Sequence, residues 1–471
     1  MKKNILILAV GLSLSFCLTS CDDYLDIKPK GATLLDKYND LRLLAVGSYS
    51  GSGWMYDDMA MVTNDCYGRT NSFMTVFSQQ NTLPYAYMTY DESLDRVALT
   101  QSDNVYSRNY SAICALNEVV LQTPSVDATE VQKSELIAQA KVKRAYFHYL
   151  LAIRFCKQYD SATAANEGGI PYVTDIVVAE ENTKLTLQET YDKMLEDCSD
   201  EVLASLPDEP YNILLPGKAF GYAVRAKVLL QMKNYSEAMK YAKQSLSYNN
   251  TVEDLTGVVN APTSFARDQF SPSNVFYAEG LTNGPGTYFI SKEMEALFED
   301  GDIQKDYAIV SQTASKTTYV FNPEDIVGLD FKVLRYSAIS GFRYNSGGVT
   351  SEQMHYIAAE CCIRTGDISG GMDLINKVRR GRIDPAKYAP LTASTEKDAM
   401  ALLMRCKRVE CLFTYNTFAD MKRWNTEEAY RTTVTRTLNG QTYTLQPYSP
   451  LWVFPFPKDA TEYNKSLTQN Y

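Results

Sequence analysis

The sequence predicts a mainly α protein in which paired helices form an α-superhelical scaffold that carries an irregular, loop-rich lobe and a short C-terminal β-hairpin. Apolar residues recur at three- and four-residue spacing in much of the segments 100–250 and 350–425, which is typical of amphipathic helices. One helix–turn–helix pattern occurs twice. The segments 51–99 and 251–349 are instead rich in Gly, Ser, Thr, Asn and aromatic residues, without a sustained helical period. Long irregular segments of this kind usually carry function.

The N-terminus predicts an export signal rather than a membrane-spanning helix. A basic start, Lys2-Lys3, precedes the apolar run Ile5–Leu18. That run has about 14 residues, whereas a spanning helix needs roughly 20. The sequence Leu18-Thr19-Ser20-Cys21 resembles the lipobox of bacterial lipoproteins, in which the cysteine is acylated with palmitate-type chains. The alternative is an ordinary signal peptide followed by a chance cysteine.

Helices are expected next, in chain order. The segment 102–124 reads as a helix capped by Ser102 and ended at Pro124, and the segment 129–159 as a helix capped by Thr129. The segment 187–207 reads as one amphipathic helix that stops at Pro207.

The segment 222–246 predicts a tetratricopeptide-like helix pair with a turn at Lys233-Asn234. Residues 355–379 repeat the pattern 133 positions later, so that Ala359 matches Ala226. The adjacent Cys361 and Cys362 then fall on apolar core positions. Because one such pair cannot bury its apolar face alone, we expect the two pairs to stack in space.

Near the end of the chain, "TTVTRTLNGQTYTLQ" alternates in polarity and contains Asn439-Gly440, which favours a two-residue hairpin turn. The expected organisation is a signal peptide, a lipidated tether and a single domain, whose scaffold and lobe each combine several segments. The ranges are 1–20 for the signal, 21–32 for the tether and 33–471 for the domain, with scaffold segments 33–50, 100–250 and 350–425 and lobe segments 51–99, 251–349 and 426–471.

Composition excludes several functions. The net charge of −10 and the absence of a Lys/Arg cluster argue against nucleic acid as a partner. The cysteines after Cys21 show no C-x-x-C pair, so no metal site is expected, and they read as core residues. The sequence has no H-E-x-x-H, G-x-S-x-G or phosphate-loop motif, and its two histidines, His148 and His355, lie in apolar helical stretches. We therefore expect neither an enzyme nor a cofactor.

Several segments together resemble the SusD/RagB family of outer-membrane lipoproteins. They are "CDDYLDIKPKG", "RAYFHYLLAIRF" followed by "GGIPYVTD", "RAKVLLQMKNYSEAMKYA", "KRVECLFTYNTFADMKRWN" and "LWVFPFPKDATEYNKSLTQNY", in the family's order from the lipobox to the last residue. One departure is the run Thr414–Thr417, where the family usually has an acidic-Gly-x-Arg run. The nearby Glu410, Asp420, Arg423 and Trp424 keep their places, and this motif is expected to pack in the helical core.

The resemblance implies a lipid-anchored, surface-exposed protein of the outer membrane that captures a nutrient, most often an oligosaccharide. It also implies that the protein acts as a hinged lid and delivers that nutrient uncleaved to a SusC-like TonB-dependent β-barrel transporter. Asp22 and Asp23 resemble the family's export tract.

A sugar site needs aromatic platforms beside polar edges, and the irregular segments supply both. The predicted ligand contacts are Trp54, Arg69, Asn71, Tyr85, Tyr288 and Tyr319. For each aromatic, the alternative is a ring packed under its own loop. Two other functions stay open, which are capture of a peptide or other non-glycan nutrient and a tetratricopeptide-like protein-interaction scaffold.

Overall fold

The computed structural model describes residues 35–47, 56–67, 76, 79–176, 182–259, 270–278, 281–282, 288–308, 331–334, 343–438 and 440–471. The described chain is mainly α, as predicted, and its strands form only short two- and three-stranded sheets. The predicted signal and the whole of the predicted tether, Cys21 included, lie outside these residues. Among the described helices, none is long and apolar enough to cross a membrane.

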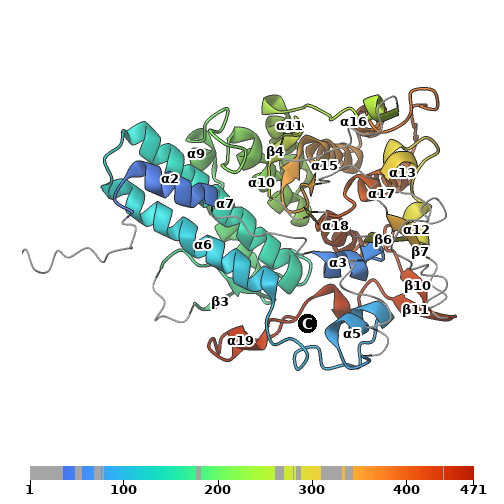
Figure 1. Cartoon of the computed structure of the whole chain (residues 1–471), viewed down its shortest axis with the longest axis horizontal. Helices are drawn as coiled ribbons and strands as arrows, with labels where there is room; N and C mark the ends of the chain where they lie inside the picture. The colour runs from blue at the N-terminus through green and yellow to red at the C-terminus, as the bar shows by residue number, and fades with distance from the viewer. Residues whose placement is uncertain are drawn as a thin grey trace, which may run out of the picture.

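The first group of helices comprises α2 (Tyr38–Gly47), α6 (Asn104–Gln122) and α7 (Glu130–Phe155), which pack side by side (Figure 1). Thr129 caps α7 in a reciprocal capping box with Gln132, as predicted for that residue. The predicted cap of α6 was wrong by one residue. Asp103, not Ser102, accepts the Tyr106 amide at 2.8 Å. A carboxylate is favoured over a hydroxyl here, because its negative charge complements the positive end of the helix macrodipole.

The single helix expected over 187–207 is two helices, α8 (Leu187–Asp197) and α9 (Asp200–Ala204). The break lies at Cys198, whose carbonyl accepts a 2.7 Å hydrogen bond from Arg225 instead of continuing the helical ladder. Tyr241 then donates to Asp200 at 2.7 Å. Tertiary partners that are distant in sequence therefore override the local helical pattern.

The two predicted helix pairs are confirmed. The first is α10 (Lys218–Gln231) with α11 (Tyr235–Tyr248), and the second is α15 (Ser351–Arg364) with α16 (Ile368–Arg380), so the starts and ends of the first helices are each 133 positions apart. Ala226 and Ala359 are both fully buried. The pairs stack through α11 and α15, where Cys362 contacts Met239, and Figure 1 shows them across the upper half of the molecule.

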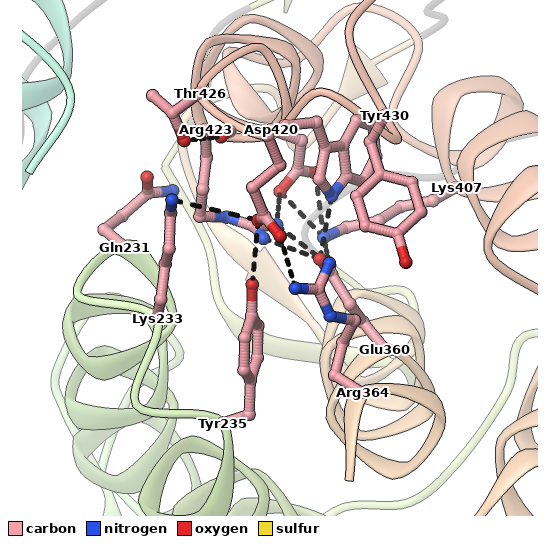
Figure 2. A network of polar contacts seen from close by, with 12 residues as sticks. Gln231, Lys233, Tyr235, Glu360, Arg364, Lys407, Asp420, Arg423, Thr426 and Tyr430 are labelled. Atoms are coloured by element: carbon pink, nitrogen blue, oxygen red, sulfur yellow. Dashed lines mark hydrogen bonds and ion pairs between the residues drawn. The ribbon is translucent and has the colours of Figure 1, made fainter. Parts of the chain in front are cut away.

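Two further helices, α17 (Glu396–Glu410) and α18 (Asn416–Trp424), carry a buried charge network (Figure 2). Glu360 of α15 accepts two hydrogen bonds from Arg423, at 2.6 and 2.9 Å, and a third from the Trp424 indole at 2.8 Å. Lys407 bonds Asp420 at 2.9 Å. Burial would raise the pKa of Glu360, but Arg423 and Lys407 outweigh it and hold that pKa at about 2. The motif packs in the core, as expected.

The remaining described elements are short. The helices are α3 (Asp57–Val62), α5 (Leu83–Thr89), α12 (Lys292–Glu295), α13 (Ile303–Ala308) and α19 (Lys458–Thr461). The strands are β1 (Cys66–Tyr67), β2 (Gly168–Pro171), β3 (Lys184–Thr186), β4 (Asn274–Phe276), β5 (Leu281–Thr282), β6 (Tyr288–Ser291), β7 (Phe331–Leu334), β8 (Arg343–Tyr344), β9 (Val349–Thr350), β10 (Val434–Leu438) and β11 (Gln441–Leu445). The pairings are β1-β6-β7, β2-β3, β4-β9, β5-β8 and β10-β11.

The antiparallel pair β10-β11 is the predicted C-terminal hairpin. Its inner face buries Val434, Arg436 and Leu445, while the intervening threonines are exposed. One hydrophobic core joins residues of the helix pairs to residues of α3, α5 and this hairpin.

Candidate functional site

The short elements α3, β1, α5, β6, α12, β7 and the hairpin β10-β11 form one region, which we call the lobe frame. Figure 1 shows α3, α5, β6, β7 and the hairpin below and to the right of the stacked helix pairs. Helix α5 begins at Thr82, whose hydroxyl accepts the Tyr85 amide at 3.3 Å, and has a proline in its first turn. Strand β6 lies between β1 and β7, and both pairings are antiparallel.

Four of the six predicted ligand contacts, Trp54, Arg69, Asn71 and Tyr319, lie outside the described residues, as does the lipidation residue Cys21. Tyr288 is the first residue of β6. Its neighbour Phe289 pairs with Tyr67 of β1, two positions before Arg69 in the chain. The backbone pairing therefore places Tyr288 beside the strand that leads to Arg69 and Asn71.

Tyr85 lies in the first turn of α5 and is half-buried. Its ring packs against the hydrophobic core, while the residues just before α5 are exposed. The half-buried Tyr443 of β11 lies near it, and burial, followed by the proximity of Tyr85, raises the pKa of Tyr443. Both tyrosines are partly exposed, and both pack against the same hydrophobic core.

Sequence reasoning missed the residue at the centre of the lobe frame. Arg436 of β10 is buried, and its guanidinium donates to Asn64 Oδ1 at 3.1 Å and to the Tyr90 hydroxyl at 2.8 Å. It also donates to the backbone carbonyls of Tyr87 (3.1 Å), Met88 (2.7 Å) and Met61. The only signal in the sequence is an arginine at an inward-facing position of an alternating strand.

Asn64, between α3 and β1, complements this arginine. It adopts a left-handed backbone conformation with φ 59°, which asparagine tolerates better than most residues. Its amide donates to the Thr435 carbonyl at 3.1 Å and to Glu293 at 3.0 Å, and its own carbonyl accepts the Ser291 hydroxyl at 2.5 Å. We call Arg436, Asn64, Tyr90 and Ser291 the Arg436 node.

Tyr90 supports the node from α5. It has a left-handed backbone at φ 51° and donates its hydroxyl to the Val62 carbonyl at 3.0 Å. The Arg436 guanidinium lies 4.5 Å from the centre of its ring. Burial raises the pKa of Tyr90 to about 12 despite the opposing charge of Arg436, so the hydroxyl stays protonated and both donates and accepts.

Two ion-pair groups attach the lobe frame to the helices. Asp65 accepts Arg408 of α17 at 2.6 Å, and burial raises the pKa of Asp65 although Arg408 opposes that shift. At the end of α7, Arg154 binds Asp58 of α3 at 2.5 Å and Asp103 at 2.6 Å. Both arginines are largely buried, so these pairs are protected from solvent screening.

Both histidines and nearly all of the described cysteines are packed in the protein interior. His148 is buried between the Arg144 carbonyl and the Val173 amide, and burial lowers its pKa to about 3. His355 is bound to the Ser351 carbonyl at 2.8 Å inside α15. The described cysteines are free and buried, except the exposed Cys114. In the described part of the chain, no cluster of three or more His, Cys, Asp or Glu side chains is arranged to hold a metal ion.

Comparison with known families gives two matches in chain order. Residues 23–230 match the family SusD-like_3, described as starch-binding and associating with the outer membrane, and residues 353–471 match the SusD family, SusD_RagB. Comparison with curated proteins gives no match.

Solved structures share the fold over nearly the whole chain. A SusD superfamily protein from Bacteroides thetaiotaomicron has a TM-score of 0.72 at 15% identity, covering 92% of this chain and 100% of its own. Surface glycan-binding protein A from Bacteroides uniformis has a TM-score of 0.69 at 14% identity, covering 92% and 98%. A SusD-like carbohydrate-binding protein from Bacteroides vulgatus has a TM-score of 0.65 at 14% identity, covering 92% and 97%. With two family matches in order and this fold throughout, the chain belongs to the SusD/RagB family.

Proposed function

We propose that this chain is a surface lipoprotein that captures an oligosaccharide and delivers it, uncleaved, to a SusC-like TonB-dependent transporter in the outer membrane. The observation that carries the proposal is the family match at both ends of the chain, together with solved relatives described as glycan-binding or carbohydrate-binding. The neutral, packed histidines favour binding over catalysis. Cys21 is the proposed anchor.

The proposed ligand contacts are those predicted from the sequence, namely Trp54, Arg69, Asn71, Tyr85, Tyr288 and Tyr319. Five of them lie on, or a few residues from, elements of the lobe frame, because Trp54 precedes α3 and both Arg69 and Asn71 follow β1. Tyr85 begins α5 and Tyr288 begins β6. Aromatic rings with polar neighbours on one rigid frame suit the apolar faces and hydroxyl rims of sugars.

A titration and a capture experiment test this function. The full-length chain is titrated by calorimetry with maltoheptaose, xylohexaose, mannohexaose and tryptic peptides of casein, and detergent-solubilised outer membrane is passed over the same protein. We expect saturable binding of one oligosaccharide and co-purification of a β-barrel protein. Peptide binding alone indicates a non-glycan nutrient, and recovery of soluble partners alone contradicts both nutrient roles.

Paired substitutions test the site. Replacing both Trp54 and Tyr288 by alanine removes two stacking surfaces, each worth roughly 1 kcal/mol, so affinity for the bound oligosaccharide should fall about tenfold or more. The matched control is Tyr211→Ala, because Tyr211 is 71% exposed in the loop between α9 and α10, away from the lobe frame. Equal affinity of the double variant and the control for the oligosaccharide would show that the ligand site lies elsewhere.

The anchor and the partner need separate tests. Cys21→Ala should move the protein from the membrane fraction to the soluble fraction, because several acyl chains are needed for firm anchoring. A Cys21→Ala protein that still sediments with membranes in the absence of the co-purified barrel would contradict the lipid anchor.

A further inference from the structure

We propose that Arg436 is the positioning residue of the ligand site, because it fixes the spacing of the segments that carry the predicted ligand contacts. This inference rests on the proposed function for what the segments bind, whereas the joining of the segments is a property of the described contacts. Arg436 lies far along the chain from its partners, 372 positions from Asn64. Its role is therefore to join parts of the lobe frame that the chain itself leaves separate.

The first step is the convergence of two helix ends. Met61 is in the last turn of α3, and Tyr87 and Met88 are in the last turn of α5. Carbonyls at the end of a helix lack partners within it and carry the negative end of the helix dipole. The Arg436 guanidinium donates to the carbonyls of all three residues. One buried cation thus holds together the ends of two helices.

The second step is the fork geometry of arginine. The three guanidinium nitrogens of Arg436 each donate to different acceptors, with Nε on Asn64, Nη1 on the carbonyls of Tyr87 and Met88, and Nη2 on the Met61 carbonyl and the Tyr90 hydroxyl. A lysine has one nitrogen with three donors, so it cannot reach acceptors in these three directions at once. The site therefore requires arginine and not merely a positive charge.

The third step extends the node to β6. Asn64 receives Arg436 on its side-chain oxygen and receives the Ser291 hydroxyl on its backbone oxygen. Ser291 ends β6, and its amide bonds the Asp65 carbonyl at 3.2 Å. Arg436 thus controls α3 and α5 directly and β6 through Asn64.

The fourth step relates the node to the ligand contacts along the chain. Trp54 is three positions before α3, Arg69 and Asn71 are two and four positions after β1, Tyr85 lies within α5 and Tyr288 opens β6. Tyr85 and Tyr288 are the contacts within the described residues, and the elements that hold them, α5 and β6, both end at the node. A shift of the node would therefore move the backbone of Tyr85 relative to that of Tyr288.

The matched control is another buried arginine. Arg144 of α7 binds Asp197 with two hydrogen bonds of 2.7 Å and Asn117 at 2.8 Å, which joins α6, α7 and α8 and no element of the lobe frame. Loss of either arginine destabilises the fold, but only loss of Arg436 should disturb the ligand segments. Comparing the two separates positioning from stability.

The experiment is amide hydrogen exchange with mass spectrometry on the full chain and on Arg436→Gln, Arg436→Lys and Arg144→Gln. In Arg436→Gln we expect exchange in 57–67, 83–91 and 288–295 to rise about tenfold, with α10 and α11 unchanged. In Arg436→Lys, exchange in these segments should lie between that of the unaltered chain and that of Arg436→Gln, because lysine keeps the positive charge but not the forked donor geometry. Arg144→Gln should raise exchange in α6, α7 and α8 instead. The proposal would be overturned if Arg436→Gln raised exchange equally across the whole chain, or if it did not raise exchange in the three segments.

A milder variant covers the case in which Arg436→Gln does not fold. Tyr90→Phe removes one hydroxyl from the node and keeps the ring under the guanidinium, so exchange in the segments 57–67 and 83–91 should rise about threefold. Unchanged exchange in Tyr90→Phe would then count against the node.

Binding is measured with the oligosaccharide that the unaltered chain binds in the panel above. Its affinity should fall about tenfold in Arg436→Lys and remain within about twofold in Arg144→Gln. Loosened segments with unchanged affinity would overturn the positioning role. If the unaltered chain binds none of the panel sugars, the proposed glycan function fails, and the exchange result still decides whether Arg436 joins the segments.

Discussion

Arg423 in the helical scaffold and Arg436 in the lobe frame are both buried, but they have different partners. Arg423 binds the Glu360 carboxylate with two hydrogen bonds, inside a network that also holds Lys407 and Asp420. Arg436 binds backbone carbonyls, an asparagine and a tyrosine hydroxyl. The scaffold arginine thus neutralises an opposite charge, whereas the lobe arginine gathers the ends of separate segments.

Two buried acids, Glu360 and Asp302, have pKa values shifted in opposite directions. Glu360 in the scaffold has a pKa of about 2, because Arg423 and Lys407 outweigh the effect of burial. Asp302, at the start of α13 and 5% exposed, has its pKa raised to about 7 by burial, although the Lys305 amide donates to it. The charge of Glu360 is therefore stabilised where it lies, whereas burial disfavours the charge of Asp302. The difference predicts opposite responses to pH.

The largest expected effect is that of Glu360→Gln. It leaves Arg423 and Lys407 buried with Asp420 as their remaining carboxylate, so unfolding in urea should show a loss of about 3 kcal/mol or more at pH 7. A loss below about 1 kcal/mol would mean that the network contributes little beyond packing.

The matched control is Glu196→Gln, the same substitution in an exposed pair with Lys193 at 2.8 Å. It should leave stability unchanged within error, because exposed ion pairs are screened by solvent. The pH dependence gives a second check. The folded pKa of Glu360 lies below its unfolded value, so its contribution is present above about pH 4.5 and is lost as pH falls toward 2.

The next largest effect is that of Asp302→Asn. The folded pKa of Asp302 lies above its unfolded value of about 4, so the protonated form is favoured in the folded state. Its contribution to stability therefore falls as pH rises from about 4 to 7. The amide mimics the protonated acid, so Asp302→Asn should stabilise the protein by about 1–2 kcal/mol at pH 8 and have little effect at pH 4.

The measurement for Asp302→Asn is the melting temperature at pH 4, 6 and 8. Both proteins share all other titrating groups, including Glu410 and Arg382, which also act on Asp302. The difference between their melting temperatures should grow with pH. A constant difference would show that Asp302 does not titrate in this range.

The smallest effect concerns the turns of the two helix pairs. Gly366 and Lys233 occupy the same place in the repeat, with φ angles of 95° and 59°. Lys233 lies in the left-handed region, but Gly366 lies beyond it, where side chains are strained. Gly366→Ala should lower the free energy of unfolding in urea by about 1 kcal/mol, although the space around the added carbon is open. The control is Ser369→Ala at an exposed position of the same helix pair, which should leave the free energy of unfolding unchanged within error.

The helix pairs were predictable from sequence because their signals are local. Apolar spacing and the 133-residue offset placed both pairs, and Thr129 and the Asn439-Gly440 turn marked one helix start and the hairpin. Where the signal was not local, prediction failed. The break at Cys198 depends on Arg225 and Tyr241, which follow later in the chain.

The candidate site shows the same limit more strongly. Tyr85 and Tyr288 were proposed from composition alone, and composition does not say which rings share a surface. The Arg436 node draws together four segments, and Asn64 and Arg436 are 372 positions apart, so no periodicity records such contacts. An arginine on the inner face of a strand is unusual, but it does not name its partners.

The stacking of α11 on α15 has a consequence for how this protein can vary. Residues 249–350 leave the stack after α11 and return at α15, and the two ends meet where β4 pairs with β9 and Ser351 bonds the Thr251 carbonyl. Because the closure entropy of a loop grows only with the logarithm of its length, this insertion can lengthen or shorten at little thermodynamic cost. The helix stack can therefore stay unchanged while the segment between α11 and α15 varies in length and sequence.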